Sequence, residues 1–160
     1  SIGYGDFTVA DEGYVPEADW PLLLVESLPV AVPGVTELPD SSWCLEATVL
    51  EREDISQDYL DNLDPWQAFL DYGRVGPELV LRQRQTGDCF QPLGLGGHEK
   101  SLHTFMIDVK IPRSLRGFVP IVASPRHIVW VAGWRIDERA RITNTTERIM
   151  HLAFRPCLDA

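Results

Sequence analysis

Cysteine is scarce in this chain, and no two cysteines lie in a CxxC pair. The three residues Cys44, Cys89 and Cys157 are an odd number in 160 residues. This argues against a disulfide framework and against a zinc site built on CxxC pairs. We expect three free thiols in a reducing compartment, which predicts a cytoplasmic location.

Long hydrophobic runs are also missing. No apolar stretch approaches the length of a membrane-spanning helix, and the first residues lack the charged-then-apolar layout of a signal peptide. We therefore expect no membrane partner. The chain begins with Ser1 rather than Met, which predicts a piece of a longer protein. Its 44% hydrophobic residues suit one globular domain with an extension.

Basic side chains are rare in the first half of the chain. Residues 1–78 carry 17 acidic and two basic side chains, for a net charge of −15. Residues 79–154 carry 11 basic and six acidic side chains, for a net charge of +5. The second half could therefore hold a polyanion that the first half would repel. Charges that merely solvate a surface are the simpler alternative.

The first half predicts an acidic leader followed by β structure. Residues 1–28 form a leader or interdomain linker, in which "WPLLLVESL" is the apolar anchor. Residues 29–160 are then the β domain. Alternation from Trp43 to Val49 after a Pro-Asp-Ser-Ser turn predicts a hairpin. The acidic run over residues 51–64 predicts a solvated loop or a short helix.

The second half predicts further strands and one amphipathic helix. Leu79 and Leu81 alternate with polar positions, as in a strand with one apolar face. The positions of Leu102, Phe105, Met106 and Val109 predict a three-turn helix that Pro112 ends, with a short second helix near Ser114. "GFVPIVAS" and "HIVWVAGW" predict a buried hairpin, and "RIDERARIT" and "ERIMHLAFRP" further strands. The fold class is mainly β with one or two short helices.

Motifs for catalysis or metal binding are incomplete. "GLGGHEKS" has Lys100 and Ser101 at P-loop positions, but Glu99 stands where the loop requires glycine. His98 and His103 are five residues apart and do not share a helix face, so we expect no metal site. A cysteine hydrolase centred on Cys89 is a third hypothesis. It ranks behind the other two, because no histidine stands out as a base for the thiol.

The basic residues of the second half are the strongest candidate for a site. Arginine predominates among them, and guanidinium groups suit bidentate contact with phosphate. Arg82 and Arg84 should share a strand face, and Arg113 and Arg116 the face of a short helix. Phe90, Phe105 and Trp130 fit a core better than a stacking platform, which favours a structured RNA backbone over an unpaired strand. The set is Arg82, Arg84, Lys100, Lys110, Arg113, Arg116, Arg135, Arg139 and Arg141.

The second half also resembles a known family. The pattern LRxRxxGDxFxPLG, then "FMIDVKIPR", then "PIV…IVWVAGWRIDER" is similar to the C-terminal domain of bacterial tRNA(Ile)-lysidine synthetase. The similarity runs over residues 79–154 and is looser upstream. Three positions depart from the family pattern: Cys89 and Ser101 stand where basic residues are common, and Gly117 stands where an acid is usual after the paired arginines. The loss of two positive charges predicts weaker contact with a phosphate backbone.

The resemblance implies a fold, a partner and a set of contact residues. It implies a β-sandwich of unusual topology, similar to a domain of the phenylalanyl-tRNA synthetase β chain. It implies contact with the acceptor stem of isoleucine tRNA, while a catalytic N-terminal domain of the same chain uses ATP and Mg to attach lysine to the wobble cytidine. The fragment itself would be non-catalytic and without cofactor. The contacts carried over are Arg82, Arg84, Lys100, Lys110, Arg113 and Arg116, with Arg135 and Arg139 as additions.

One alternative stays open beside the tRNA-binding interpretation. The chain could be a non-catalytic protein-interaction or regulatory module, in which the acidic half docks on the basic half or on a catalytic partner. Removal of residues 1–28 would then lower stability. The sequence is also compatible with a homodimer.

Overall fold

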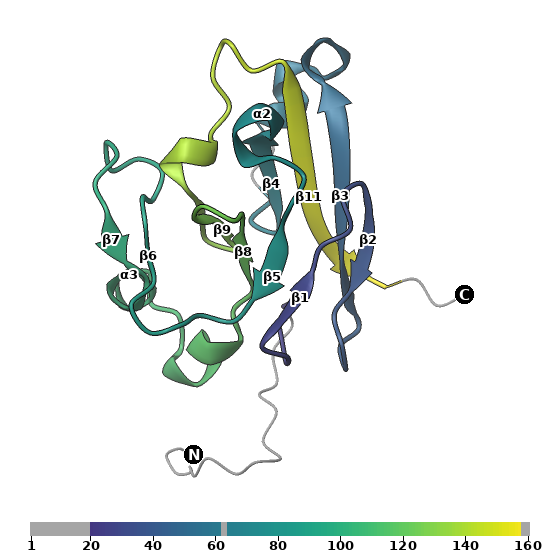
Figure 1. Cartoon of the computed structure of the whole chain (residues 1–160). Coiled ribbons are helices and arrows are strands. Elements are labelled where there is room, and N and C mark those ends of the chain that lie inside the picture. Colours follow the sequence, from purple (N-terminus) through teal and green to yellow (C-terminus); the bar gives the residue numbers. More distant parts are fainter. Residues whose placement is uncertain (1–19, 62–63, 158–160) are drawn as a thin grey trace.

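The computed structural model describes residues 20–61 and 64–157. Most of its strands belong to two antiparallel sheets, A and B (Figure 1). Sheet A has the strand order β1 (Ser27–Pro29), β5 (Val80–Arg82), β8 (Ile121–Ala123), β9 (Ile128–Val131) and β10 (Arg135–Ile136). Sheet B has the order β2 (Gly34–Glu37), β3 (Trp43–Glu51), β11 (Arg148–Pro156) and β4 (Gln67–Asp71). A separate two-stranded ribbon pairs β6 (Cys89–Phe90) with β7 (Lys100–Ser101).

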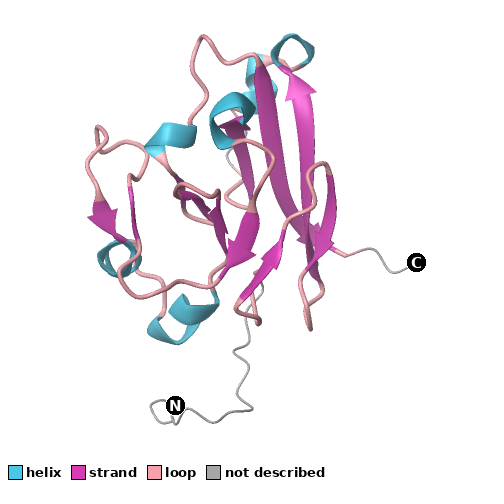
Figure 2. Ribbon diagram, in the orientation of Figure 1, coloured by secondary structure: helices cyan, strands magenta, loops and turns pink. Residues whose placement is uncertain are grey.

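Helical segments are short and lie between the strands, as Figure 2 shows. The mainly β fold class is therefore confirmed, whereas the phenylalanyl-tRNA synthetase comparison stays a prediction. No helix in the described part of the chain has the length and apolar character needed to cross a bilayer. The segments are η2 (Arg52–Asp54), α1 (Gln57–Leu60), α2 (Tyr72–Val75), α3 (Leu102–Asp108), η3 (Arg113–Phe118) and η4 (Glu138–Ala140).

Sheet B joins the two halves of the sequence. β2 and β3 form the predicted hairpin, with Gly34 opposite Ala47 and Glu37 opposite Cys44. β11 lies between β3 and β4 and pairs with β3 along all nine of its residues. The acidic half therefore gains its central strand from the basic half, so that both belong to one core.

Sheet A is the middle layer of the domain. Every residue of β8 and β9 is buried, because apolar clusters cover both faces of the sheet. One cluster fills the space toward sheet B and includes Leu81 and Trp130. The other cluster, which includes Ile121 and Val131, lies on the far face. The hairpin predicted from the two β-branched runs is confirmed by the pairing of β8 with β9.

The α3 layer, made of β6, β7, α3 and η3, covers the far face of sheet A (Figure 1). Leu102, Phe105 and Met106 are buried as the periodicity predicted. The helix is shorter than the expected three turns, since it ends at Asp108 instead of running to Pro112. Lys110 adopts a positive φ of 64° there, and this left-handed residue turns the chain out of the helix. The short helix expected near Ser114 is the 3₁₀ segment η3.

Two other segments refine the sequence predictions. The acidic run contains η2 and α1, as expected for a loop with a short helix. Only Arg135–Ile136 of "RIDERARIT" is a strand, and η4 follows it. The structure differs because Asp137 is buried and its carboxylate accepts the backbone N–H of Arg139, which turns the chain.

The end of the predicted leader is part of the domain. Leu22 and Leu23 are buried in the two clusters, and β1 pairs with β5. Residues 1–19 lie outside the described residues. Loss of stability after removal of residues 1–28 would follow from the lost core contacts alone, so that experiment does not separate the regulatory hypothesis from the tRNA-binding one.

Gly133 provides a test of the packing between the sheets. Its φ is +90°, and a Cβ atom there would lie 2.5 Å from a ring carbon of Trp66. We expect Gly133→Ala to lower the free energy of unfolding by about 2 to 3 kcal/mol, because it combines backbone strain with overpacking. Thermal and urea unfolding measure this change. Gly117→Ala is the matched control, since its Cβ meets open space, and a loss similar to that of Gly133→Ala there would contradict the explanation.

Candidate nucleic-acid interface

Arg82, at the end of β5, is held by a carboxylate of the domain itself. Its guanidinium makes two hydrogen bonds to Asp88, of 2.9 and 3.0 Å. Asp88 also accepts the backbone N–H of Gln85 at 2.7 Å. Arg82 therefore braces the turn between β5 and β6, and its charge is compensated there. Arg84 lies beyond the end of β5, so the strand face that we expected it to share with Arg82 does not extend to it.

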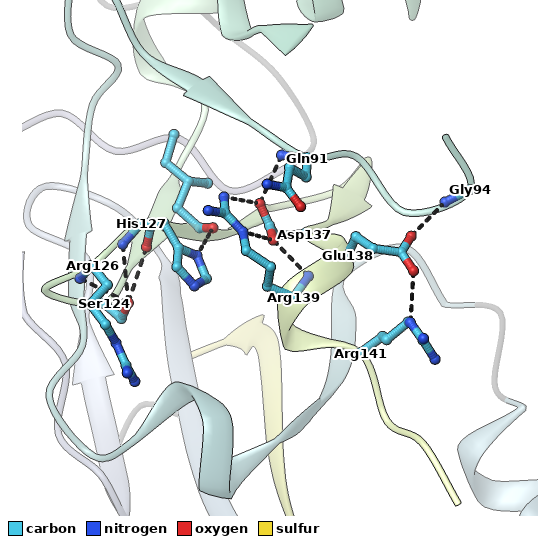
Figure 3. Close-up of polar contacts among 10 residues, drawn as sticks. Gln91, Gly94, Ser124, Arg126, His127, Asp137, Glu138, Arg139 and Arg141 are labelled. Atoms are coloured by element: carbon cyan, nitrogen blue, oxygen red, sulfur yellow. Dashed lines mark hydrogen bonds and ion pairs between the residues drawn. The ribbon is translucent and has the colours of Figure 1, made fainter. Parts of the chain in front are cut away.

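Arg139 is held in the same way, by a fully buried carboxylate. Asp137 accepts the Nε and Nη2 groups of Arg139, each at 2.9 Å, and the backbone N–H of Gln91 at 2.8 Å (Figure 3). Burial alone would raise the pKa of Asp137, but these hydrogen bonds and the backbone N–H of Arg139 outweigh it and hold the pKa below 3.8. The hydrogen bond from Arg139 to Asp137 in turn raises the pKa of the guanidinium.

Glu138 and Arg141 complete this ion-pair group. Arg141 donates to Glu138 at 2.7 Å, and Glu138 accepts the backbone N–H of Gly94 (Figure 3). These ion pairs lie on a 3₁₀ turn around a buried acid, because Asp137 points inward and anchors the β6–β7 connection.

Lys100 also has a carboxylate partner. It lies on β7, one residue before the cap of α3, and its ammonium group pairs with Asp108 near the other end of that helix. The ion pair with Asp108 supplies a counter-charge to Lys100 within the domain.

The other five predicted cations surround α3 and have no carboxylate ion pair among the described residues. Arg84 Nη1 lies 3.7 Å from the sulfur of Met106. The guanidinium of Arg135 lies 5.6 Å from the ring centre of Phe105 and donates to the carbonyl of Leu93 at 3.2 Å. We call the five residues the α3 cation set: Arg84, Lys110, Arg113, Arg116 and Arg135.

Three members of the α3 cation set follow directly after α3. Lys110 and Arg113 are exposed. Arg116 is partly buried, and its Nε donates to the carbonyl of Ile111 at 2.9 Å. Arg113 and Arg116 both lie on η3, as the spacing predicted. The positive φ of Lys110 places a charged side chain at the sharp exit of the helix.

Arg126 is a basic residue that the sequence prediction missed. It lies in the turn between β8 and β9 and donates to the carbonyl of Arg74 at 2.8 Å. With Arg82 and Arg139 it lines a depression of about 440 Å³, which Asp88 and Glu99 also line. An anion in this depression would meet charges of both signs. A basic residue in the Ser-Pro-Arg turn was the signal that could have found it.

The two positions at which the family commonly has a basic residue lie opposite each other. Cys89 pairs with Ser101 across the β6–β7 ribbon. Ser101 caps α3 by accepting the backbone N–H of Thr104 at 3.1 Å. The polar contact of Cys89 is the carbonyl of Gly87 at 3.5 Å, which cannot serve as a base for a thiol nucleophile.

The glycine loop does not form a nucleotide site. Gly94, Gly96 and Gly97 have positive φ, and the loop leads into β7 rather than into a helix N-terminus. Lys100 is already paired with Asp108. These residues therefore do not fit the phosphates of ATP. No group of three or more metal-ligating side chains gathers among residues 20–61 and 64–157.

The layers define a class of domain: a β-sandwich with an added helical layer and cations on that layer. A family profile described as the TilS substrate C-terminal domain matches residues 79–152. The crystal structure of a TILS C-terminal domain has the same fold, with a TM-score of 0.65 and 24% identity, over 84% of this chain and 100% of that chain. Residues 79–152 of the chain therefore match the TilS C-terminal domain family.

Curated relatives agree with this assignment. The tRNA(Ile)-lysidine synthase of Dehalococcoides mccartyi is 46% identical over 88 residues, which are 55% of this chain and 18% of the relative. That of Caldanaerobacter subterraneus is 37% identical over 123 residues, which are 77% of this chain and 25% of the relative. The matched region thus spans about a fifth to a quarter of the length of these relatives.

The buried carboxylate of Asp137 gives a prediction on stability. We expect Asp137→Asn to lower the free energy of unfolding at pH 7 by about 2 to 4 kcal/mol, because Arg139 and the backbone donors lose an ionised partner inside the fold. Urea unfolding measures the change. Glu138→Gln is the control, because its ion pair is solvent-accessible, and an equal loss there would contradict a special role of Asp137.

The same group predicts a pH dependence. The pKa of Asp137 is lower in the folded state than its ordinary value of 3.8. Its contribution is therefore complete above that value and is lost as the pH falls through the folded pKa. We expect the difference in melting temperature between wild type and Asp137→Asn to be largest near pH 7 and to shrink below pH 4. If the difference in melting temperature did not change between pH 7 and pH 4, the negative charge of Asp137 would not be the source of the stabilisation.

Proposed function

We propose that this chain is the RNA-contacting C-terminal domain of a tRNA(Ile)-lysidine synthase, and that it binds isoleucine tRNA through the α3 cation set. The observation that carries the proposal is the split among the nine predicted cations: four are paired with carboxylates of the domain, and the five around α3 have no such partner among the described residues. A domain that needed its arginines only for folding would have no reason to leave five cations around one helix without carboxylate partners.

The geometry favours a folded RNA backbone over bases. Phe90, Phe105 and Trp130 are at most 2% exposed, so these rings cannot stack on unpaired bases. Guanidinium groups recognise phosphate in a planar, bidentate way. Arg84 and Arg135 are steadied by side chains of α3, so less side-chain freedom is lost on binding. The acceptor stem, an A-form helix read through its backbone, is the part of the tRNA that we assign to this surface.

The rest of the reaction belongs to the parent enzyme in this proposal. A catalytic N-terminal domain of the same chain would use ATP and Mg to activate the wobble cytidine. Lysine would then react with the activated cytidine to give the product. The present domain would hold the tRNA at a distance from that chemistry, in the cytoplasm. A homodimer stays a prediction.

Charge reversal on the α3 cation set tests the proposal. We expect Lys110→Glu with Arg113→Glu to weaken binding of an isoleucine tRNA transcript by roughly tenfold or more, because two exposed phosphate contacts are lost. The slope of log affinity against log salt should fall by about two for the same reason. Filter binding or fluorescence anisotropy over a salt series measures both quantities.

The control pair changes the net charge equally at another place. Arg148→Glu with Arg155→Glu alters sheet B, and we expect it to leave tRNA affinity within about threefold of wild type, since exposed charges beyond a Debye length are largely screened. Circular dichroism of both pairs confirms folding. Equal losses in the two pairs would mean that only net charge matters. An affinity of the wild type that is flat between low and moderate salt would contradict phosphate binding altogether.

A further inference from the structure

Two cysteines that are far apart in the sequence meet at one end of sheet B. Cys44 lies on β3, and Cys157 follows the last residue of β11. Their sulfur atoms are 2.7 Å apart. Register places Cys44 opposite Arg155, and the backbone N–H of Cys157 donates to the carbonyl of Ser42 at 2.7 Å, so both backbones are held at this point.

The exposure of the two thiols differs. Cys44 is only 3% exposed, whereas Cys157 is partly exposed at the surface of the sheet. An oxidant can therefore reach Cys157, and the buried sulfur of Cys44 lies in place to react with the product. All three thiols are free, as the sequence predicted. Two of them form a proximal pair, and Cys89 on β6 is separate and exposed.

We propose that Cys44 and Cys157 are a redox modification site, at which a peroxide converts the pair to a reversible disulfide that fastens the end of β11 to β3. This inference does not rest on the proposed function, because the pair lies on sheet B and the α3 cation set belongs to the opposite layer.

The chemistry balances with hydrogen peroxide as the oxidant. The sulfur of Cys157, as thiolate, attacks one peroxide oxygen; the O–O bond breaks, hydroxide leaves, and a sulfenic acid remains. The sulfur of Cys44 then attacks the sulfur of Cys157, the S–O bond breaks, and water is lost as the S–S bond forms. Two thiols give up two electrons and two protons, and the peroxide becomes two waters.

The surroundings of the pair set the rate of this reaction. The hydrogen bond to Cys44 and burial raise the pKa of Cys157 to about 11. Glu37 and Arg155 face the pair and act in opposite directions, and Arg155 is itself paired with Glu46. Little thiolate is present at neutral pH, and the thiolate is the nucleophile. The disulfide therefore forms slowly and faster at higher pH, as suits a stabilising lock rather than a rapid sensor.

Closure of this bond would restrict the unfolded chain strongly. It joins residues 113 positions apart, and long closed loops lose the most conformational entropy in the unfolded state. The oxidised domain should therefore melt at a higher temperature than the reduced domain, by roughly 5 to 15 °C.

The test uses the chain with Cys89→Ser, so that only the pair can react. The protein is treated with hydrogen peroxide, remaining thiols are alkylated, and peptides are identified by mass spectrometry without reduction. We expect one cross-linked peptide pair containing Cys44 and Cys157, lost on treatment with dithiothreitol. We also expect the higher melting temperature and a rate that rises about tenfold per pH unit between pH 7 and 9.

Single variants are the controls. Cys44→Ser and Cys157→Ser, each in the Cys89→Ser background, should show no cross-link and no rise in melting temperature after peroxide. Cys44→Ala replaces Cys44→Ser if the buried hydroxyl prevents folding. The proposal is overturned if both thiols of the folded protein can still be alkylated after the peroxide treatment. It is also overturned if Cys157 is oxidised to sulfinic acid without cross-linking to Cys44.

Discussion

The burial of sheet A on both faces is the constraint on which the rest of the domain depends. β8 and β9 present no exposed residue, so a covering layer is required on each side. Sheet B supplies one cover and the α3 layer supplies the other. Because β11 completes sheet B from the end of the sequence, this cover cannot form without both halves of the chain. The two halves are therefore one folding unit, although their charges have opposite signs.

Because of this layering, the opposite net charges of the two halves of the sequence lie on different sides of the domain. The acidic half builds β2, β3, η2 and α1, whose exposed carboxylates lie on the side of sheet B. The basic half builds the α3 layer. Four of the predicted cations in this half are neutralised by Asp88, Asp108, Asp137 and Glu138, and the α3 cation set remains. Ion pairs thus separate the arginines that shape the domain from the cations that are available to a partner, a distinction that net charge alone does not make.

Periodicity predicted what depends on neighbours in sequence. The apolar stripe of Leu102 and Phe105 identified α3, and β-branched runs identified β8 and β9, because burial of one face follows from spacing. Periodicity could not predict ion pairs such as Arg82 with Asp88, which require the geometry of an intervening turn. It also could not bring Cys44 to Cys157, because that contact depends on the register of β11 against β3. Local pattern determines which side chain is buried, and tertiary geometry determines what it meets.

The thickness of the domain explains how a chain of net charge −10 can present a surface for a polyanion. Packed sheets are about 10 Å apart, and a helix layer adds a similar distance. The acidic surface of sheet B and the α3 cation set are therefore separated by roughly 20 Å, about two Debye lengths at physiological ionic strength. A phosphate bound at α3, as we propose, would interact with the nearby cations, while the repulsion from sheet B would be largely screened. The two layers of buried apolar side chains thus have an electrostatic effect as well as a structural one, because they keep surfaces of opposite charge too far apart to cancel.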